Sequence, residues 1–450
     1  MNEQKMNRRT FLEATGLAVA SLAASQGLLS AQQRDATGSI SRIEILEGAN
    51  ARIDRCRKGD IALKLVGLNG EPLKEGTVAK IEQIRHKFLF GCNIFKLGRC
   101  RTPDDNVAYE NHFAALLNYA TLPFYWWNYE RAQDKPDYAG SEEILKWCIS
   151  HNVTTKGHPL AWNWVDPKWL PDDPEAAMKI QFERIAKCVG QFKGGIDIWD
   201  VVNEATQYDR PECKKNAPKL TEAIRRMGVG AYVRQAFNAA RSANANATLV
   251  INDYRTDPAF GEQVISELVD NKRQSLYDVI GIQSHMHGGY WGPEQTWSVC
   301  ENFAKFEKPL HFTETTVVSG PRTDQGWNTT SEGEKQQAKQ VAEFYTVLFS
   351  HRAVEAITWW DFTDQGAWQR APAGFTRADM TPKPVYEELH RLIKDEWWTR
   401  CEVTSGPGGI VRLRGFFGEY KVSVPGESGL LKGIFRIDKD TKQIVEVRVS

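Results

Sequence analysis

Two glutamates stand directly after apolar, β-branched runs, and this placement makes them the first candidates for chemistry. The run from Ile196 to Asn203 leads into Glu204, and the run from Pro309 to Thr313 leads into Glu314. Such runs predict buried strands, so each carboxyl group is expected at the C-terminal end of a strand. Two carboxyl groups that flank a sugar linkage are the minimum equipment for cleaving a glycosidic bond.

Other predicted strands also end in polar or aromatic residues. Lys156 to Trp162 reads Lys-Gly-His-Pro-Leu-Ala-Trp, Gln283 to His285 reads Gln-Ser-His, and Thr358 to Asp361 reads Thr-Trp-Trp-Asp. The C-terminal ends of parallel strands meet at one edge, so these side chains would gather around the two glutamates. Three histidines, His158, His285 and His287, also leave a zinc site open as an alternative, because neutral imidazoles are common zinc ligands.

The elements that would position these groups alternate between strand-like and helix-like patterns along the middle of the chain. Helix starts are expected at Ser141, at Asp173 followed by Pro174, and at the capping box Ser331-x-x-Glu334. Eight strands alternating with helices predict an α/β protein with a (β/α)8 TIM barrel. An open doubly wound sheet is the alternative, but no glycine-rich phosphate loop follows the first strand. The eight strand-like runs are 88–94, 119–126, 153–158, 196–203, 248–253, 279–285, 310–314 and 356–362.

The two flanks of the predicted barrel have the alternating pattern of short strands. Residues 40–85 contain two runs joined through Asn69-Gly70, a hairpin signal, and residues 398–450 contain four more runs. We therefore expect small all-β accessory segments at both ends: an N-terminal β module at 40–85 and a C-terminal β module at 398–450, around a catalytic barrel at 86–397. A pair of hairpins is marginal alone, so the two segments are expected to pack into one β-sandwich.

The N-terminal segment has the pattern of a targeting sequence. Arg8-Arg9 precedes an apolar stretch with many small residues from Ala14 to Leu29, which resembles a twin-arginine export signal occupying residues 1–31. The expected location is therefore periplasmic or extracellular. A short N-terminal transmembrane helix is the alternative, although glycine and serine dilute the apolar run. No other stretch is long and apolar enough to span a bilayer, so stable membrane insertion is not expected.

The bulk composition indicates a neutral partner. Lysine plus arginine equals aspartate plus glutamate, 57 against 57, so no net field favours nucleic acid or an anionic membrane. Fifteen tryptophans and thirteen tyrosines supply flat faces that suit sugars as well as a protein core. The eight cysteines are scattered and are expected to be mostly buried thiols, with Cys92 and Cys100 the first pair to test for a disulfide. Composition leaves the oligomeric state open.

Four short motifs together resemble one known family. Gly157-His158-x-Leu160-x-Trp162, Trp199-Asp200-Val201-Val202-Asn203-Glu204, Gly281-Ile282-Gln283-x-His285 and Thr313-Glu314 are similar, in order and spacing, to the motifs of glycoside hydrolase family 10, which is best known for endo-1,4-β-xylanases. The resemblance covers about residues 88–397 and excludes the β ends. It implies a retaining glycoside hydrolase that cleaves β-1,4-linked polysaccharide, most directly xylan or a decorated xylan, by double displacement. No metal or organic cofactor is implied.

The resemblance also implies a role for each motif residue. Glu204 matches the acid/base and Glu314 the nucleophile, while Asn203 would donate to the sugar 2-hydroxyl. His285 would hydrogen-bond Glu314 and keep it oriented and ionised. The remaining expected substrate-binding residues are His158 and Gln283, which would read sugar hydroxyls, and Trp162, Trp360 and Trp368, which would form the walls of the site.

Several positions depart from the family pattern. After the second strand the family carries a Glu-Asn pair and a lysine that grip the sugar, whereas residues 122–128 here read Leu-Pro-Phe-Tyr-Trp-Trp-Asn and predict an aromatic wall. Thr316 stands where an aspartate usually supports the histidine, Asn163 replaces a histidine, and Asp361 replaces a glycine. Three alternatives therefore stay open: a non-catalytic carbohydrate-binding barrel, a glycosidase of a different β-glycan, and a metal-dependent hydrolase that uses the three histidines.

Overall fold

Eight parallel strands close into a barrel, which confirms the predicted (β/α)8 fold. The computed structural model describes residues 40–426, 429–441 and 444–450, so the expected export signal at 1–31 lies outside the described residues. Neighbouring strands pair in the order β12-β3-β4-β5-β6-β7-β8-β9, and β9 pairs with β12 to close the ring. Their bounds are β3 Leu89–Asn93, β4 Tyr119–Pro123, β5 Thr154–His158, β6 Ile198–Asn203, β7 Thr248–Asp253, β8 Val279–Met286, β9 Leu310–Val317 and β12 Val354–Trp359.

Helices surround the barrel and begin close to where the sequence predicts them. Asp173 caps α7 as expected, because its carboxylate accepts the backbone N–H of Ala176. Ser141 is not a cap: Asp137 accepts the N–H of Gly140, so α6 starts one turn earlier. Likewise Thr330, not Ser331, caps α13. The helix bounds are α4 Pro103–Leu116, α5 Trp126–Tyr129, α6 Tyr138–Ser150, α7 Pro174–Gln191, α8 Pro211–Asn216, α9 Pro218–Met227, α10 Val229–Ala243, α11 Pro258–Gln263, α12 Gly292–Ala304, α13 Ser331–Ser350 and α14 Pro384–His390.

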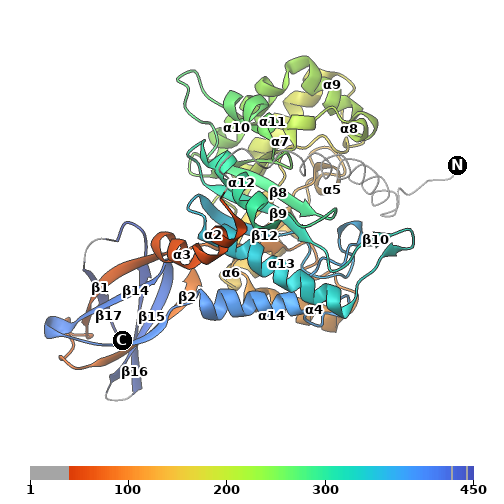
Figure 1. Ribbon diagram of the computed structural model, residues 1–450. Coiled ribbons are helices and arrows are strands. Elements are labelled where there is room, and N and C mark those ends of the chain that lie inside the picture. The colour runs from red at the N-terminus through yellow and green to blue at the C-terminus, as the bar shows by residue number, and fades with distance from the viewer. Residues whose placement is uncertain (1–39, 427–428, 442–443) are drawn as a thin grey trace.

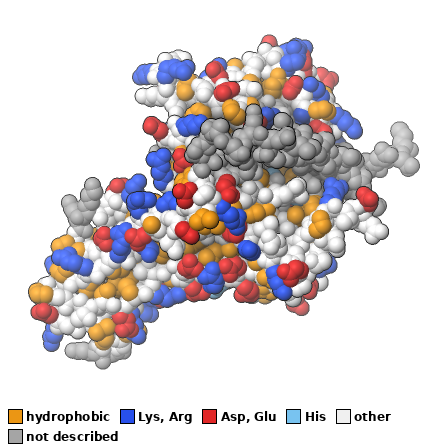
Figure 2. Space-filling model, in the orientation of Figure 1, with side chains coloured by type: hydrophobic (Ala, Val, Ile, Leu, Met, Phe, Trp, Pro, Cys, Tyr) orange, Lys and Arg blue, Asp and Glu red, His pale blue; other side chains and the backbone are white. Residues whose placement is uncertain are grey.

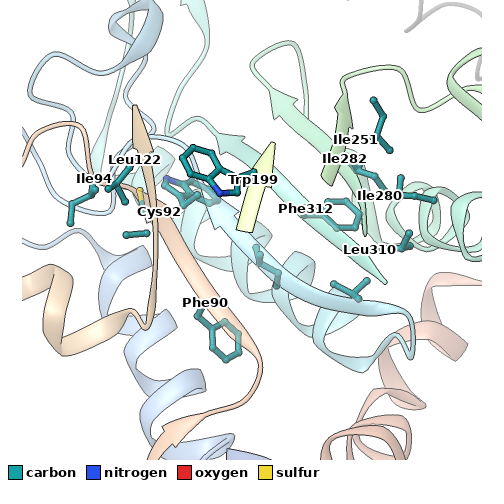
Figure 3. Close-up of a cluster of buried hydrophobic side chains, with 14 of the residues drawn as sticks. Phe90, Cys92, Ile94, Leu122, Trp199, Ile251, Ile280, Ile282, Leu310 and Phe312 are labelled. Atoms are coloured by element: carbon teal, nitrogen blue, oxygen red, sulfur yellow. The ribbon is translucent and has the colours of Figure 1, made fainter. Parts of the chain in front are cut away.

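The main hydrophobic core lies between the strands and these helices. Figure 3 shows apolar side chains such as Trp199, Ile282 and Phe312 projecting from different barrel strands. The ring of Phe312 lies edge-on against Phe344 of α13. Side chains alternate across a strand, so the neighbours of these apolar residues point the other way. That alternation turns polar residues such as Asp200 and Gln283 into the barrel, where both are buried.

Gly157 shows how tightly this core is built beside the expected site. A Cβ atom at Gly157 would lie 2.1 Å from Trp199 Cζ3. We therefore expect Gly157→Ala to lower the free energy of unfolding by about 1–3 kcal/mol, because the buried indole must shift. Thermal or denaturant unfolding checks this. The control is Gly190→Ala in α7, where nothing lies within 4 Å of the added atom and a slight gain is expected; equal effects of the two changes would contradict the packing argument.

The two ends of the chain combine in one β unit beside the barrel. Figure 1 shows strands from the N-terminal part lying among strands from the C-terminal part. One sheet has the order β14-β1-β17 and the other β13-β2-β15-β16, and apolar side chains of both sheets share one core. The N- and C-terminal segments are thus joined within each sheet. The bounds are β1 Lys58–Val66, β2 Val78–His86, β13 Arg400–Thr404, β14 Ile410–Phe416, β15 Gly418–Gly426, β16 Gly429–Ile437 and β17 Val445–Arg448.

Two expectations for residues 40–85 were wrong. Residues 42–57 form the helices α2 (Arg42–Glu47) and α3 (Ala49–Arg57), because Ser41 and Glu44 make a capping box and Ile45, Ala49 and Ile53 form a buried stripe with helical spacing. β1 and β2 also do not pair as a hairpin. They belong to different sheets, so the turn at Asn69-Gly70 connects the sheets.

Aromatic and guanidinium contacts fasten the β unit to the barrel. Arg57 donates from Nε to Phe349 O at 2.6 Å and from Nη2 to His351 O at 2.6 Å. The imidazole of His86 lies edge-on to Phe90 and Phe416, and burial lowers its pKa to about 3. Phe90 lies at the N-terminal part of β3, so the β unit is attached at the end of the barrel opposite the C-terminal strand ends.

The remaining surface and cysteine features agree with the composition. On the face drawn in Figure 2, lysines and arginines are interspersed with aspartates and glutamates. All eight cysteines are unpaired, so Cys92 and Cys100 form no disulfide, and five of the eight are buried. In the part of the chain that the structure describes, no helix combines the length and apolar character needed to cross a membrane.

Candidate active site

Glu204 lies immediately after β6 in an unusual backbone conformation. Its φ and ψ are 58° and 42°, in the left-handed region that non-glycine residues rarely adopt. The backbone N–H of Glu204 donates to Asn252 O at 2.9 Å, which holds this turn against the end of β7. Residues with such strained backbone are often found at functional sites. Here the left-handed turn directs the Glu204 carboxylate toward the centre of the ring formed by the strand ends.

The Glu204 carboxylate is surrounded by donors. Oε1 accepts from Gln283 Nε2 at 3.1 Å and from Asn203 Nδ2 at 3.2 Å. Oε2 accepts from Trp162 Nε1 at 3.2 Å and from Nη2 of Arg210, with which it forms an ion pair. Burial raises the pKa of Glu204, but the Arg210 charge and these hydrogen bonds outweigh burial and hold that pKa below its usual range. The carboxyl is therefore ionised in this state.

Glu314 lies in β9 and is almost completely buried. Oε1 accepts from Asn252 Nδ2 at 3.0 Å, and Oε2 lies 3.1 Å from His285 Nε2. Burial lowers the pKa of His285 to about 3, so its imidazole is neutral and can donate one N–H to Glu314. Burial raises the pKa of Glu314 to about 7, while His158 opposes the rise and the charge on Glu204 adds to it. The two carboxyls thus have opposite pKa shifts.

A chain of amides connects the two carboxyls. The Oδ1 atom of Asn203 accepts from Gln283 Nε2 at 3.2 Å and from Asn252 Nδ2 at 2.7 Å. Gln283 also donates to Glu204, and Asn252 also donates to Glu314. Asn203 therefore lies between the carboxyls with its amide orientation fixed. Sequence reasoning missed Asn252, although the polar pair Asn252-Asp253 ends its strand as visibly as the motif residues end theirs.

Asn252 is the most direct test of this connection. Because Asn252→Ala removes the amide donor to Glu314 Oε1 and one of the two donors to Asn203 Oδ1, we expect turnover to fall about 10- to 100-fold. The KM should change little, because no sugar contact is removed. Steady-state kinetics on an aryl β-glycoside and thermal unfolding measure the two effects. An unchanged turnover number would contradict a positioning role for Asn252.

A second buried network approaches Glu314 from β5 and β6. Asp200 Oδ2 accepts from His158 Nδ1 at 2.7 Å and lies 2.7 Å from Lys156 Nζ. His158 Nε2 lies 3.7 Å from Glu314 Oε1. Burial raises the pKa of Asp200, but Lys156 and His158 outweigh it and the net pKa is low. An ionised Asp200 therefore orients His158 toward the site, a role that sequence reasoning had not assigned to it.

Aromatic rings surround the carboxyls, as the sequence predicts. The ring of Trp360 lies edge-on to His158 and His285, with centroid distances of 5.4 and 5.8 Å. Trp368 packs on His285 at 4.6 Å. The segment after β4 contributes two more rings. The ring centroids of Tyr125 and Trp127 lie 6.0 and 5.9 Å from that of Trp162. The nine candidate residues are thus assembled at one site, with seven of them around the two glutamates. They are Asn203, Glu204, Glu314, His158, His285, Gln283, Trp162, Trp360 and Trp368.

The departures from the family pattern have structural explanations. Thr316 Oγ1 lies 2.9 Å from His285 Nδ1, so the threonine replaces the partner that was expected to be lost. Asn163 donates to Tyr208 O at 2.7 Å and supports a loop instead of the site. Asp361 accepts the backbone N–H of Trp368 at 3.0 Å, and burial raises its pKa to about 7. Asp361 therefore positions the Trp368 wall.

The three histidines do not form a metal-binding cluster. The rings of His285 and His287 are 5.8 Å apart, and His158 is engaged by Asp200. Among the residues with described positions, no three His, Cys, Asp or Glu side chains converge to hold a metal ion. The geometry therefore gives the metal-dependent alternative no support.

The order of these residues along the chain matches one protein family. The family described as "Glycosyl hydrolase family 10" matches residues 88–391. The chain belongs to glycosyl hydrolase family 10. This match covers the barrel and both glutamates, and it leaves the β unit outside.

Two curated proteins and one solved structure illustrate what this chain is similar to. "Anti-sigma-I factor RsgI6" of Acetivibrio thermocellus is 24% identical over 86% of this chain and 47% of its own length. "Endo-1,4-beta-xylanase B" of Paenibacillus barcinonensis is 27% identical over 51% of this chain and 72% of its own length. The chain spans less than half the length of the first three curated relatives. The crystal structure of native xylanase 10B from Thermotoga maritima superimposes with a TM-score of 0.57 at 23% identity, over 69% of this chain and 96% of that chain.

Proposed function

We propose that the chain is a retaining glycoside hydrolase that cleaves β-1,4-linked polysaccharide, with xylan or a decorated xylan as the first candidate. The observation that carries this proposal is the pair of buried carboxyls, one directly after β6 and the other inside β9, joined through the amides of Asn203, Gln283 and Asn252. Membership of family 10 supports the same chemistry.

Each glutamate has a distinct part in the proposed double displacement. Glu314 attacks the anomeric carbon and forms a glycosyl–enzyme ester while Glu204 gives its proton to the leaving oxygen. Glu204 then removes a proton from water, and the water attacks the anomeric carbon and restores the original configuration. Asn203 donates from Nδ2 to Glu204 here, so the same donor is available to a sugar hydroxyl next to that carboxyl.

A different β-glycan is the second candidate because of the segment after β4. Tyr125 and Trp127 present rings at this position, where the xylanase resemblance leads one to expect polar groups. Aromatic faces bind the apolar faces of many sugars, so this wall is less selective for xylose than a set of hydrogen-bonding groups.

The test is a panel of soluble and insoluble β-glycans with product analysis, using the Glu314→Ala variant as blank. Xylo-oligosaccharides that appear with the wild type and not with the variant would support both the reaction and the substrate. Turnover of another β-glycan alone would keep the reaction and change the substrate. Binding without turnover on every glycan, including aryl β-glycosides, would favour the non-catalytic carbohydrate-binding alternative.

A further inference from the structure

Arg210 contacts Glu204 in a way that the proposed reaction does not need. Its guanidinium contacts two aromatic rings, with Cζ 4.9 Å from the Trp164 centroid and 5.5 Å from the Tyr254 centroid. Nη2 donates to Glu204 Oε2, and the side chain is 15% exposed. The buried Nε atom has no hydrogen-bond partner among the described residues. The guanidinium is therefore packed against aromatic rings, and one of its edge donors is buried without a hydrogen-bond partner.

The buried arginines Arg57 and Arg184, which support the fold, have another kind of partner. Arg184 donates to the backbone oxygens of Leu160 and Phe124, and its side chain is buried within the barrel wall. Backbone oxygens at such positions do not change during a reaction. Arg210 instead pairs with the carboxyl on which the chemistry depends, so its partner must change protonation state during each catalytic cycle.

This ion pair opposes the role of Glu204 as an acid. A cation beside the carboxylate stabilises the ionised form, whereas the first chemical step needs the protonated form. Glu314 has the opposite problem, because its raised pKa favours the protonated form although a nucleophile must be ionised. In the resting site the two pKa shifts favour a proton on Glu314 over a proton on Glu204, and moving the Arg210 charge away from Glu204 would reduce this bias.

The glycosidic oxygen fixes where the leaving-group sugar must lie. Proton transfer requires Glu204 to be within hydrogen-bond reach of that oxygen. Arg210 is bonded to the same carboxylate, so it is next to the sugar that leaves. Its planar fork matches the paired oxygens of a carboxylate or a sulfate ester, and its two aromatic neighbours keep that fork rigid.

We propose that Arg210 is a specificity-determining residue that binds an anionic substituent, a uronate carboxylate or a sulfate ester, on the leaving-group sugar and thereby releases Glu204 to act as the acid. The inference rests on the proposed function. In the exchange, the Arg210 N–H groups leave Glu204 Oε2 for the substituent oxygens. One proton moves from Glu314 to Glu204, so the pair gains and loses none.

The experiment compares matched β-1,4-oligosaccharides that differ only in the substituent next to the cleaved bond: none, a uronate, or a sulfate ester. The wild type is expected to have a kcat/KM about 10- to 100-fold higher for an anionic substrate than for the neutral one. In Arg210→Met this ratio should fall to about one or below, because the anion loses its partner. Arg210→Lys should restore part of the ratio, because the charge returns without the fork.

An aryl β-glycoside with an acidic phenol serves as the internal standard. Its leaving group needs little protonation, so its rate reports folded enzyme with a working nucleophile. If Arg210→Met loses the same factor on this substrate as on the oligosaccharides, the residue is only structural and the inference is overturned. The inference is also overturned if the ratio of kcat/KM for the anionic substrate to kcat/KM for the neutral one is the same in the wild type and in Arg210→Met. If the wild type cleaves none of these substrates, the proposed function itself has failed.

The pH profile on the neutral substrate gives a second readout. Arg210 lowers the pKa of Glu204, so removing it should let Glu204 keep its proton to higher pH and move the alkaline limb of kcat/KM upward. An unmoved limb would count against the inference. Burial raises the pKa of Asp253 to about 6, so Asp253 itself could contribute to the pH profile. Asp253→Asn is the control that removes this contribution. The groups that face the ion pair are His285 and Gln283 from β8, Asp253 and Tyr254 at the end of β7, Cys213 and Glu212 from α8, and Glu314 from β9.

Discussion

Replacing Glu314 with alanine is expected to reduce turnover of every substrate by at least about a thousandfold. The loss should be equal for polymers and for aryl glycosides, because both must pass through the same glycosyl–enzyme ester. The fold should survive, since a buried carboxyl that is costly to ionise contributes little to stability. Initial rates on both substrate types and thermal unfolding measure these effects.

Glu262→Ala is the matched control, because Glu262 is an exposed glutamate and no loss is expected from its removal. A residual rate above roughly 1% of wild type in Glu314→Ala, confirmed on independently purified protein, would contradict the nucleophile assignment. The cavity left by the side chain also allows a positive test. Azide or formate should restore turnover of an aryl β-glycoside through a single displacement, and the product should then have inverted anomeric configuration.

The barrel and its carboxyls could be predicted because the signals are local and strong. An apolar run that ends in a carboxylate, as before Glu204 and Glu314, predicts both the strand and the placement of the side chain. Asn252 follows the same rule and could have been found. Arg210 could not, because it lies in an irregular segment between Glu204 and α8 and meets its partner only through the left-handed turn at Glu204.

The terminal segments show a different limit of sequence reasoning. The strand pattern of β1 and β2 was clear, but which sheet each would join depended on partners from residues 400–448. The helices α2 and α3 were missed because their apolar stripe is short and charged residues separate its members along the sequence. Ion pairs such as Lys421–Glu82 at 3.0 Å and Arg436–Glu419 at 3.2 Å cover the outer face of the larger sheet. These ion pairs, together with the attachment at the base of the barrel, favour a β unit that braces the barrel over one that binds glycan.

Replacing Glu204 should slow the cleavage of polymers and of aryl glycosides by different factors, whereas Glu314→Ala is expected to slow both equally. In Glu204→Ala, cleavage of polymer is expected to fall about 10²- to 10⁴-fold, because a sugar alkoxide cannot leave without a proton. Release of an acidic phenol from an aryl glycoside should fall much less in the first turnover. The second step, however, loses its general base, so the glycosyl–enzyme ester should accumulate. Stopped-flow measurement is expected to show a burst of one phenol per active site followed by a slow steady rate.

Glu204→Gln is the matched variant for this experiment. Alanine leaves the Arg210 charge without its carboxylate partner, which alone costs stability, whereas glutamine retains an oxygen that can accept from Trp162 and Arg210. Both variants should nevertheless give the same burst, because neither can supply or remove a proton. Equal losses on polymer and aryl glycoside, with no burst, would contradict the acid/base assignment. In that case Glu204 would only orient the site, and the anion-binding role of Arg210 would lose its basis as well.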